Sequence, residues 1–272
     1  MTRNLEIKIN FGISIILKYY YIFEYLLLNK IYDNIYVSID YDLLKYYRNS
    51  SDDYYNNYIV FLKYINEFNN IIIVSTIDNN YKSISATELS QQHNIPVRFK
   101  IHKKLIKNQL DFNYDFITIS TKILGIGKKI YNKFKNELIK ILNNSKYVIV
   151  LLGERKISQC KEYIIHKTYS IYEDLANNLI NYKDFTIEDN TKNNELCPLL
   201  NTFDIFNKSK LNIFISSGGI SELIPYSSNN ILGFTYNGNI LNKNNYLHEK
   251  TNNINIFNNY NDFINKLRTI NI

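Results

Sequence analysis

The sequence is poor in residues that build disulfide frameworks and metal sites. Among 272 residues there are two cysteines and four histidines. Cys160 and Cys197 show no CxxC or Cys/His spacing, so neither a zinc site nor a disulfide framework is indicated. The histidines are isolated from one another as well. We therefore expect no metal site, and the cysteine usage fits a reducing, cytoplasmic setting.

Glycine and proline are also scarce, with eight and three residues. No Walker P-loop is present, and no GxGxxG motif follows the first apolar run, which argues against kinases and dehydrogenases. A serine hydrolase is disfavoured because the serines of SSGG precede the glycines, whereas the nucleophile of GxSxG lies between them. Most glycines follow apolar runs, where open α/β sheets turn and bind ligands, namely Gly12, Gly125, Gly127, Gly153, Gly218 and Gly219.

Long uncharged hydrophobic runs and single-sign charge blocks are missing. The net charge is +7, but lysines are interleaved with Asp and Glu, so no nucleic-acid partner is expected. The most apolar stretch, residues 11–30, has the length of a membrane span but contains Lys18 and Glu24. We interpret it as a buried amphipathic helix, and we expect no transmembrane span and no secretion signal.

With 45% hydrophobic residues the chain can bury a substantial core. Short apolar runs alternate with longer helical stretches, which predicts parallel sheets wound with helices. In the first half the predicted helices cover residues 13–28 and 55–68. The predicted strands there cover residues 5–9, 34–39, 71–75 and 97–101. These elements predict one Rossmann-like unit.

The same alternation continues in the second half and predicts a second Rossmann-like unit. Its strands are predicted over residues 116–121, 147–153, 184–187, 212–217, 231–235 and 254–257. Its helices are predicted over residues 128–142, 169–180 and 199–206, from residue 220, and over 259–269. Periodicity is lost over residues 103–115, so we predict two domains, residues 1–110 and residues 111–272.

Three short stretches resemble GT-B glycosyltransferases, and in particular the heptosyltransferase-like, glycosyltransferase family 9-like branch. They are IKINFGISII (residues 7–16), ISTKILGIGKKIYNKF (119–134) and SSGGISEL (216–223). The third also resembles the donor-site turn of the transferase that adds N-acetylglucosamine to lipid-linked muramyl peptide. The resemblance implies an α/β fold of two Rossmann-like domains facing each other across a cleft.

The second stretch implies part of a donor site for a nucleotide-diphosphate sugar. In similar enzymes a Ser or Thr and a Lys after the first strand of the donor domain contact the diphosphate, and Thr121 and Lys122 match them. Lysine is a mobile point charge suited to phosphate. Gly125 and Gly127 would let backbone N–H groups approach the diphosphate, and a helix from Lys128 would add the positive end of its dipole. A solvated basic helix start is the alternative.

The third stretch implies the rest of the donor site. Gly218 and Gly219 would allow close approach of the backbone to a diphosphate, and Ser221 could donate a hydroxyl to it. Ser217, directly before the glycines, is a further donor-binding candidate. The resemblance assigns the ribose hydroxyls of the donor nucleotide to Glu222. The alternative for Glu222 is an acid that interacts with the dipole at a helix N-terminus.

The residues expected for catalysis match similar enzymes less completely than the donor-site residues do. Gly12 and Ser14 match the acceptor loop of similar enzymes, which carry an Asp soon after the glycine, and this acid is missing here. Asp40 and Asp42, just after the second predicted strand, are the candidate bases. Glu154 and Arg155, after the strand over residues 147–153, are further donor-side candidates.

The resemblance thus implies metal-independent transfer of a sugar from a nucleotide-diphosphate sugar to a hydroxyl of a glycan or other acceptor. No cofactor beyond the donor is expected, and a homo-oligomer is left open. A sugar-nucleotide 2-epimerase of the same architecture is an alternative, although the short chain and few histidines argue against it. A catalytically silent nucleotide-sugar-binding protein is favoured by the missing loop acid. The tyrosine-rich runs from residues 18 and 53 are interpreted as half-buried packing.

Overall fold

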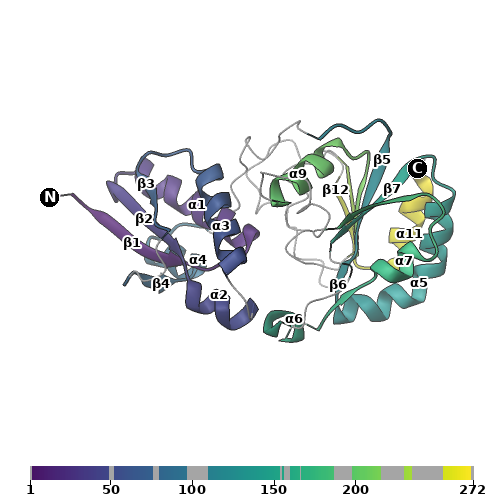
Figure 1. The fold of residues 1–272 in the computed structure, drawn as a ribbon, viewed down its shortest axis with the longest axis horizontal. Helices are drawn as coiled ribbons and strands as arrows, with labels where there is room; N and C mark the ends of the chain where they lie inside the picture. Colours follow the sequence, from purple (N-terminus) through teal and green to yellow (C-terminus); the bar gives the residue numbers. More distant parts are fainter. Residues whose placement is uncertain are drawn as a thin grey trace. The chain divides into compact units, whose positions relative to one another are not determined.

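The structure is a computed structural model that describes residues 2–48, 52–75, 80–96, 110–153, 155, 160–165, 167–186, 198–215, 230–234 and 254–270. The described elements fall into two compact units (Figure 1). Unit 1 contains the elements from β1 to α4, and unit 2 those from β5 to α11. The predicted division between residues 110 and 111 borders on residues 97–109, which lie outside the described residues, so it stays a prediction.

Unit 1 contains a parallel sheet in the order β3-β2-β1-β4. Its strands are β1 (Asn4–Ile9), β2 (Asn34–Ile39), β3 (Ile71–Ile73) and β4 (Lys82–Ile84). Ile7 and Ile9 of β1 are buried beside Val37 and Ile39 of β2, while Glu6 is exposed. The chain first adds strands on one side of β1 and then places β4 on the other. The topological switch point of this sheet therefore lies between β1 and β4.

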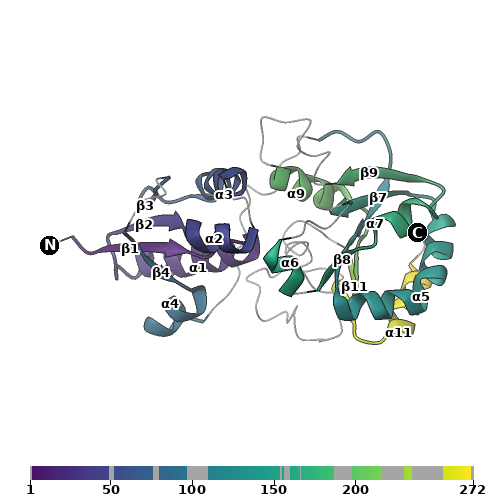
Figure 2. The ribbon, with the colours of Figure 1, turned by 60° about the horizontal axis from the view of Figure 1, so that its bottom comes forward.

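The helices of unit 1 are α1 (Ile13–Leu28), α2 (Tyr41–Arg48), α3 (Asp52–Ile65) and α4 (Ala86–Gln92). Figure 2 shows α1 between α3 and α4. The buried hydroxyl of Tyr20 in α1 donates to the carbonyl oxygen of Leu62 in α3 over 3.2 Å, and α1 also contacts α4. The apolar side chains of Ile16, Leu17 and Phe23 are fully buried, as predicted for a buried helix.

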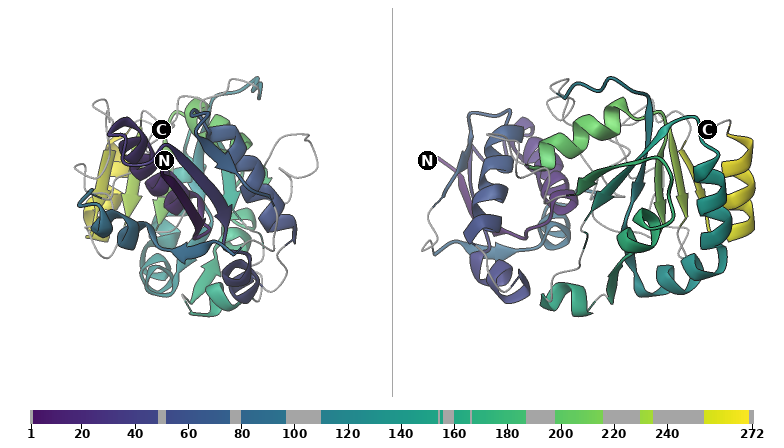
Figure 3. Two further views of the ribbon diagram at one scale, coloured as in Figure 1. Left: turned by 90° about the vertical axis from the view of Figure 1, so that its left-hand side faces the viewer. Right: turned by 45° about the vertical axis from the view of Figure 1, so that its right-hand side comes forward.

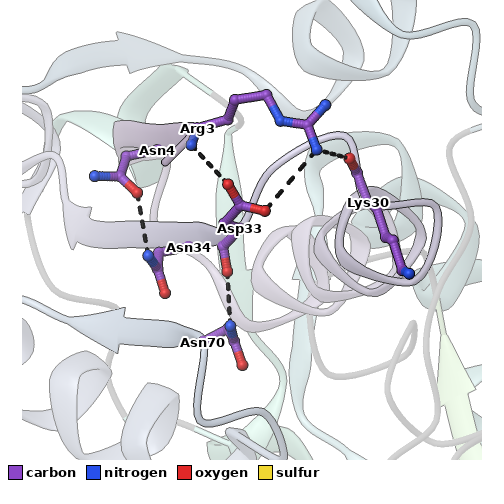
Figure 4. A network of polar contacts seen from close by, with 6 residues as sticks. All are labelled: Arg3, Asn4, Lys30, Asp33, Asn34 and Asn70. Atoms are coloured by element: carbon purple, nitrogen blue, oxygen red, sulfur yellow. Dashed lines mark hydrogen bonds and ion pairs between the residues drawn. The ribbon is translucent and has the colours of Figure 1, made fainter. Parts of the chain in front are cut away.

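Polar contacts tie the amino ends of β1, β2 and β3 together (Figure 4). The Arg3 backbone N–H donates to Asp33 Oδ2 over 2.7 Å, and the Asn70 side-chain amide donates to the Asp33 carbonyl oxygen over 2.7 Å. Asn34 donates to the side-chain oxygen of Asn4 over 3.1 Å. These contacts serve the sheet itself, and ligand sites of open α/β sheets lie at the opposite, carboxyl edge.

Unit 2 contains a parallel sheet of six strands in the order β12-β11-β10-β5-β7-β9. The strands are β5 (Phe116–Ser120), β7 (Val148–Gly153), β9 (Tyr182–Thr186), β10 (Asn212–Ile215), β11 (Ile231–Phe234) and β12 (Ile254–Phe257). Counted along this unit, the order is 6-5-4-1-2-3, which is the doubly wound Rossmann arrangement. The switch point therefore lies between β5 and β10.

Helices cover both faces of this sheet. The helices are α5 (Gly125–Asn143), α6 (Lys161–Ile165), α7 (Tyr172–Ala176), α9 (Pro198–Lys208) and α11 (Tyr260–Thr269). The right-hand view of Figure 3 shows α5 and α11 on one side and α9 on the other. The rings of Phe134 in α5 and Phe263 in α11 lie 5.7 Å apart, and both approach Phe234 of β11. This aromatic contact joins both helices to the sheet.

Several predicted elements differ from the structure in their bounds. The helix predicted over residues 55–68 begins at Asp52 and ends at Ile65. The helix predicted over residues 169–180 is wrong at its start, because β8 (Thr168–Ser170) pairs antiparallel with β6 (Lys122–Leu124), and the helix covers only Tyr172–Ala176. Pairing with a distant segment here outweighs the helical pattern. The helix predicted from Lys128 begins at Gly125. The strand predicted over 97–101 and the helix predicted from 220 lie outside the described residues.

Candidate functional site

The switch point of unit 2 lies between β5, which Thr121 and Lys122 follow, and β10, which ends directly before the second predicted donor stretch. β5 and β10 are parallel neighbours, and the buried hydroxyl of Thr118 donates to the side-chain oxygen of Asn212 over 2.5 Å. Thr121 and Lys122 directly follow β5. β10 ends at Ile215, directly before the predicted donor turn. The turn residues themselves lie outside the described residues, namely Ser217, Gly218, Gly219, Ser221 and Glu222.

Thr121 is turned into the protein. Its side chain is fully buried, its hydroxyl donates to the Leu152 carbonyl oxygen over 3.1 Å, and its backbone N–H donates to the same oxygen over 2.8 Å. Gly153 makes this arrangement feasible. Its φ is +127°, and a Cβ there would lie 2.6 Å from Thr121 Oγ1. Thr121 therefore holds the end of β5 against the end of β7. These contacts are structural, and they fix the backbone directly before Lys122.

Lys122 begins β6 and is half-buried. Lys122 is the strand partner of Ser170 in β8, so the segment after β5 is held as a short strand. This corrects the expectation that a glycine loop runs directly from the first strand of the domain into a helix. A lysine held on a strand is restricted in position, which favours binding a group of fixed geometry.

Gly125 and Gly127 belong to α5 itself, which corrects the view that they form a loop in front of the helix. A Cβ on Gly125 would lie 3.0 Å from Lys167 Cβ and 3.3 Å from the Lys167 carbonyl oxygen, so this glycine allows close packing before β8. Gly127 is buried in the first turn. Neither the Leu124 cap nor the first turn supplies an acidic side chain to the N-terminus of α5.

Lys128 is a basic residue that the sequence analysis used only to mark a helix start. It lies in the first turn of α5 and is exposed, with Nζ 4.2 Å from the ring centroid of exposed Tyr169 in β8. A lysine at a helix N-terminus opposes the helix dipole, and a bound anion would offset this cost. The pairing of β6 with β8 brings Tyr169 here, which no local pattern in the sequence indicates.

A second polar cluster lies beyond the end of β7, on the side of β9. The guanidinium of Arg155 forms an ion pair with Asp184 Oδ2, and the Tyr172 hydroxyl donates to the same oxygen over 2.9 Å. Burial, together with the hydrogen bond to Asp184 and its charge, raises the pKa of Tyr172. Asp184 belongs to β9, which β7 separates from β5. Tyr172, however, directly follows Ile171, whose N–H donates to the Thr121 carbonyl oxygen over 2.8 Å, so the cluster adjoins the segment that follows β5. Glu154 lies outside the described residues.

At the carboxyl edge of unit 1, Gly12 and Tyr19 shape the loop between β1 and α1. Gly12 is the N-cap of α1, with φ +106° and ψ +127°, a backbone conformation that favours glycine. Ser14 lies in the first turn of that helix. The buried Tyr19 hydroxyl donates to the Ile84 carbonyl oxygen and accepts from the Asn10 backbone N–H over 3.2 Å. Tyr19, which the sequence analysis missed, thus joins β1 and β4 at their switch point.

The two candidate bases have different surroundings. Asp40 is 9% exposed, and its Oδ1 accepts from the Leu43 backbone N–H over 2.9 Å while its Oδ2 accepts from the Ser83 hydroxyl over 2.5 Å. It therefore caps α2. Asp42 is exposed in the first turn of α2. The catalytic assignment of either residue stays a prediction, because the cap and the hydrogen bond from Ser83 account for these contacts of Asp40 as structural ones.

Within the part of the chain that the structure describes, no three His, Cys, Asp or Glu residues are grouped so that they could hold a metal ion. No helix found there combines the length and apolar character that crossing a membrane requires.

No protein-family model and no curated protein matches the chain. Among solved structures it is similar to TibC from enterotoxigenic E. coli, described as a bacterial iron-containing dodecameric glycosyltransferase, with 10% identity and a TM-score of 0.53 over 86% of this chain and 58% of TibC. A second TibC structure, described as a heptosyltransferase in complex with ADP-D-beta-D-heptose, matches with 11% identity and a TM-score of 0.53, over 86% of this chain and 59% of that one.

A glycosyl transferase family 9 protein from Veillonella parvula matches over 99% of this chain and 90% of its own, with 10% identity and a TM-score of 0.48. The chain spans somewhat less than three fifths of the TibC length. The likeness to TibC and the strand orders confirm the predicted fold class, an α/β fold of GT-B type with parallel sheets.

Proposed function

We propose that this chain is a glycosyltransferase that moves a sugar from a nucleotide-diphosphate sugar to an acceptor hydroxyl. One observation carries the proposal. In the Rossmann-type sheet of unit 2, Lys122 and the turn after Ile215 follow two strands that flank the switch point, which is where open α/β sheets bind nucleotides. The similarity in fold to TibC, one structure of which contains ADP-D-beta-D-heptose, supports a nucleotide sugar as the ligand class.

In this proposal the donor diphosphate is bound by Lys122, by backbone N–H groups of Gly218 and Gly219, and by the Ser221 hydroxyl, with Glu222 on the ribose. Thr121 positions Lys122, and Lys128 adds a second cation near the N-terminus of α5. The acceptor oxygen attacks the anomeric carbon, the bond from that carbon to the diphosphate oxygen breaks, and the electron pair leaves with the nucleoside diphosphate. Donors and cations already aimed at that oxygen stabilise its growing charge, so no metal is required.

The acceptor side of the proposal rests on the carboxyl edge of unit 1, near Gly12 and Ser14. The proton of the acceptor hydroxyl needs a base, and Asp40 is the buried carboxylate at the end of β2. Asp40→Asn tests this role, because Asn still caps α2 through its side-chain oxygen. We expect the transfer rate to fall at least about 100-fold with little change in the unfolding midpoint. A rate that falls only as much as stability does would leave Asp40 as a cap alone.

The donor site is tested by thermal-shift measurements with UDP, GDP, ADP and CMP. We expect at least one of them to stabilise the protein, and Lys122→Ala to reduce that shift. Lys146→Ala is the matched control, since Lys146 is exposed beside the amino end of β7. If no nucleotide stabilises the protein and Glu222→Ala changes nothing, the proposal is wrong.

Turnover is tested with a panel of nucleotide sugars and acceptors. Release of nucleoside diphosphate that depends on the acceptor marks a transferase. An isomerised donor marks a 2-epimerase, and binding without turnover marks a silent binding protein. Dialysis against EDTA should leave the transfer rate unchanged, and a rate restored only by added metal would contradict the metal-free mechanism. We also propose a cytoplasmic location, on the basis of the cysteine usage.

A further inference from the structure

Exposed isoleucines and lysines gather beside the start of α5 in unit 2, and we call them the basic–aliphatic patch: Lys129, Lys133, Ile164, Ile165 and Lys167. The isoleucines end α6, Lys167 lies between α6 and β8, and the other two lysines lie in the first half of α5. Figure 1 shows α6 and the beginning of α5 at the same end of unit 2. The proposed donor site uses none of these residues.

Two neighbouring isoleucines of the patch are turned to solvent. Ile164 is 63% exposed and Ile165 is 54% exposed, whereas Ile213 in the sheet of unit 2 is fully buried. The start of α6 is anchored, because Cys160 directly before it is buried and its carbonyl oxygen accepts from the Ile164 N–H over 3.1 Å. Adjacent aliphatic side chains in water cost free energy, and burying them against a partner recovers it.

The turn between α6 and β8 joins the isoleucines to the lysines of α5. The Lys167 N–H donates to the Ile164 carbonyl oxygen over 3.1 Å, and the φ of Lys167 is +47°, so the chain reverses here from α6 into β8. A Cβ on Gly125 would lie 3.0 Å from Lys167 Cβ, so the start of α5 lies against the same turn. Lys129 is four residues after Gly125, and Lys133 four after Lys129, so both continue this side of α5. The patch is therefore one surface.

The patch carries a local excess of positive charge. Its lysines are all exposed. Over residues 125–135 and 161–169 the sequence contains a single acidic residue, Glu162, although acids and lysines are interleaved along the chain as a whole. The first acidic residue of α5 is Glu137, which forms an ion pair with Arg268 over 2.8 Å. A partner of the patch is therefore expected to be negatively charged.

Exposed aliphatic side chains beside lysines are suited to the surface of an anionic membrane. The isoleucines can enter the boundary between headgroups and acyl chains while the lysines stay at the level of the phosphates. Tyr169 of β8 is 37% exposed and borders the patch, since a Cβ on Gly125 would lie 3.6 Å from its ring. Tyrosine is enriched at membrane interfaces. A nucleic acid would be bound by stacked aromatic rings and would gain nothing from exposed isoleucines.

We propose that the basic–aliphatic patch binds the surface of an anionic membrane, so that unit 2 attaches this protein peripherally to the bilayer. The attachment is reversible, because a few lysines and two isoleucines give a modest affinity. Each lysine held near an anionic surface strengthens binding about 5-fold, and salt weakens this part of the attraction. The inference does not depend on the proposed transferase activity, and its test needs no sugar and no nucleotide.

The test is co-sedimentation of the full chain with vesicles of phosphatidylcholine alone and of phosphatidylcholine mixed with an equal amount of phosphatidylglycerol. We expect binding to the mixed vesicles to be at least about 10-fold tighter and to weaken as salt is added. Ile164→Ser combined with Ile165→Ser should weaken it at least about 10-fold, because the apolar contribution is lost. Lys129→Gln combined with Lys133→Gln should weaken it about 5-fold to 25-fold.

Two variants at the other end of α5 are the matched controls. Ile180 is 83% exposed, and its N–H donates to the side chain of Asn143, the last residue of α5, so Ile180→Ser removes an exposed isoleucine away from the patch. Lys140→Gln combined with Lys146→Gln removes the same charge as the double lysine change, from two exposed positions. Both controls should bind the mixed vesicles to within about 2-fold of the unmodified chain. Circular dichroism checks the fold of each variant.

The proposal is overturned if the protein binds neither kind of vesicle, if it binds both kinds equally, or if the controls lose as much affinity as the patch variants. Binding to a single-stranded RNA of mixed sequence but to no vesicle also overturns it, in favour of a nucleic-acid surface. The patch variants should keep the thermal shift that a nucleoside diphosphate causes in the unmodified chain. A protein that such a nucleotide stabilises but that binds no vesicle keeps the proposed function and loses the membrane surface, and vesicle binding without any nucleotide effect has the opposite meaning.

Discussion

The contact between Gly153 and Thr121 predicts a measurable energetic coupling at the end of β5 and β7. Gly153→Ala places a Cβ 2.6 Å from Thr121 Oγ1 and holds a non-glycine residue at φ +127°. The backbone strain costs about 1–3 kcal/mol. The steric overlap costs about 1–3 kcal/mol more, as for overpacked cores. We therefore expect Gly153→Ala to lower the free energy of unfolding by roughly 2–6 kcal/mol.

Thr121→Ala removes the hydroxyl that donates to the Leu152 carbonyl oxygen, and this oxygen keeps its bond from the Thr121 N–H. That loss costs about 0.5–1.5 kcal/mol, with a small further term for the lost methyl group. In the double variant the backbone strain remains but the overlap is gone. The double variant should therefore be more stable than the sum of the single changes predicts, by about 1–3 kcal/mol.

The assay is equilibrium urea unfolding followed by far-ultraviolet circular dichroism, with stability differences taken from the midpoints at a common slope. Thr121→Val is the control, because it keeps an atom near the position of Oγ1 and should not relieve Gly153→Ala. If the single effects simply add to within about 0.5 kcal/mol, Thr121 is not the group for which Gly153 makes room. Relief by Thr121→Val as well would refute the steric reasoning.

Other predictions concern the core and the response to pH. Gly233→Ala should lower the free energy of unfolding by at least about 1–3 kcal/mol, because its Cβ would lie 2.0 Å from Cζ of Phe214. Adding Phe214→Leu should restore part of this free energy, as measured by urea unfolding. Burial raises the pKa of several tyrosines and does so most strongly for four of them. The neutral forms of these four therefore stabilise the fold fully below about pH 10, and this stabilisation falls as the pH rises further. The four are Tyr19, Tyr20, Tyr131 and Tyr172. The absorbance at 295 nm, which reports tyrosine ionisation, and the circular dichroism, which reports folding, should then change together above about pH 10. Ionisation of all tyrosines while the protein stays folded would contradict the assignment.

Elements with a long apolar pattern of their own were predictable from the sequence. The helix over residues 13–28 and the strands over 34–39 and 254–257 have the predicted bounds. The three-residue strand β3 lies in an apolar run and was predicted, whereas β4, β6 and β8, also of three residues each, contain polar residues and show no such run. Their pairing depends on partners far along the chain, so the local sequence carries no signal for them.

The location of the candidate site could be predicted because the ends of strands can be predicted from the sequence. Because Lys122 and the turn after Ile215 each follow an apolar run, Rossmann topology was sufficient to suggest that they meet at one edge. The direction of the Thr121 side chain was not predictable, since it depends on the conformation of Gly153, which lies on another strand. The second hydrogen bond of Asp40 depends in the same way on Ser83 of β4, a strand that the sequence did not predict.

The two carboxyl edges share a physical design that bears on the proposed chemistry. In unit 1, the buried Tyr19 hydroxyl joins the end of β1 to the end of β4, and in unit 2 the buried Thr121 hydroxyl joins the end of β5 to β7. Each bond fixes the chain directly before or after a segment that the proposal assigns to a ligand. Groups fixed in this way need little reorganisation when charge develops in the reaction. Tyr19→Phe should therefore affect acceptor binding more than donor binding, and Thr121→Ala the reverse, when each is measured with its own ligand.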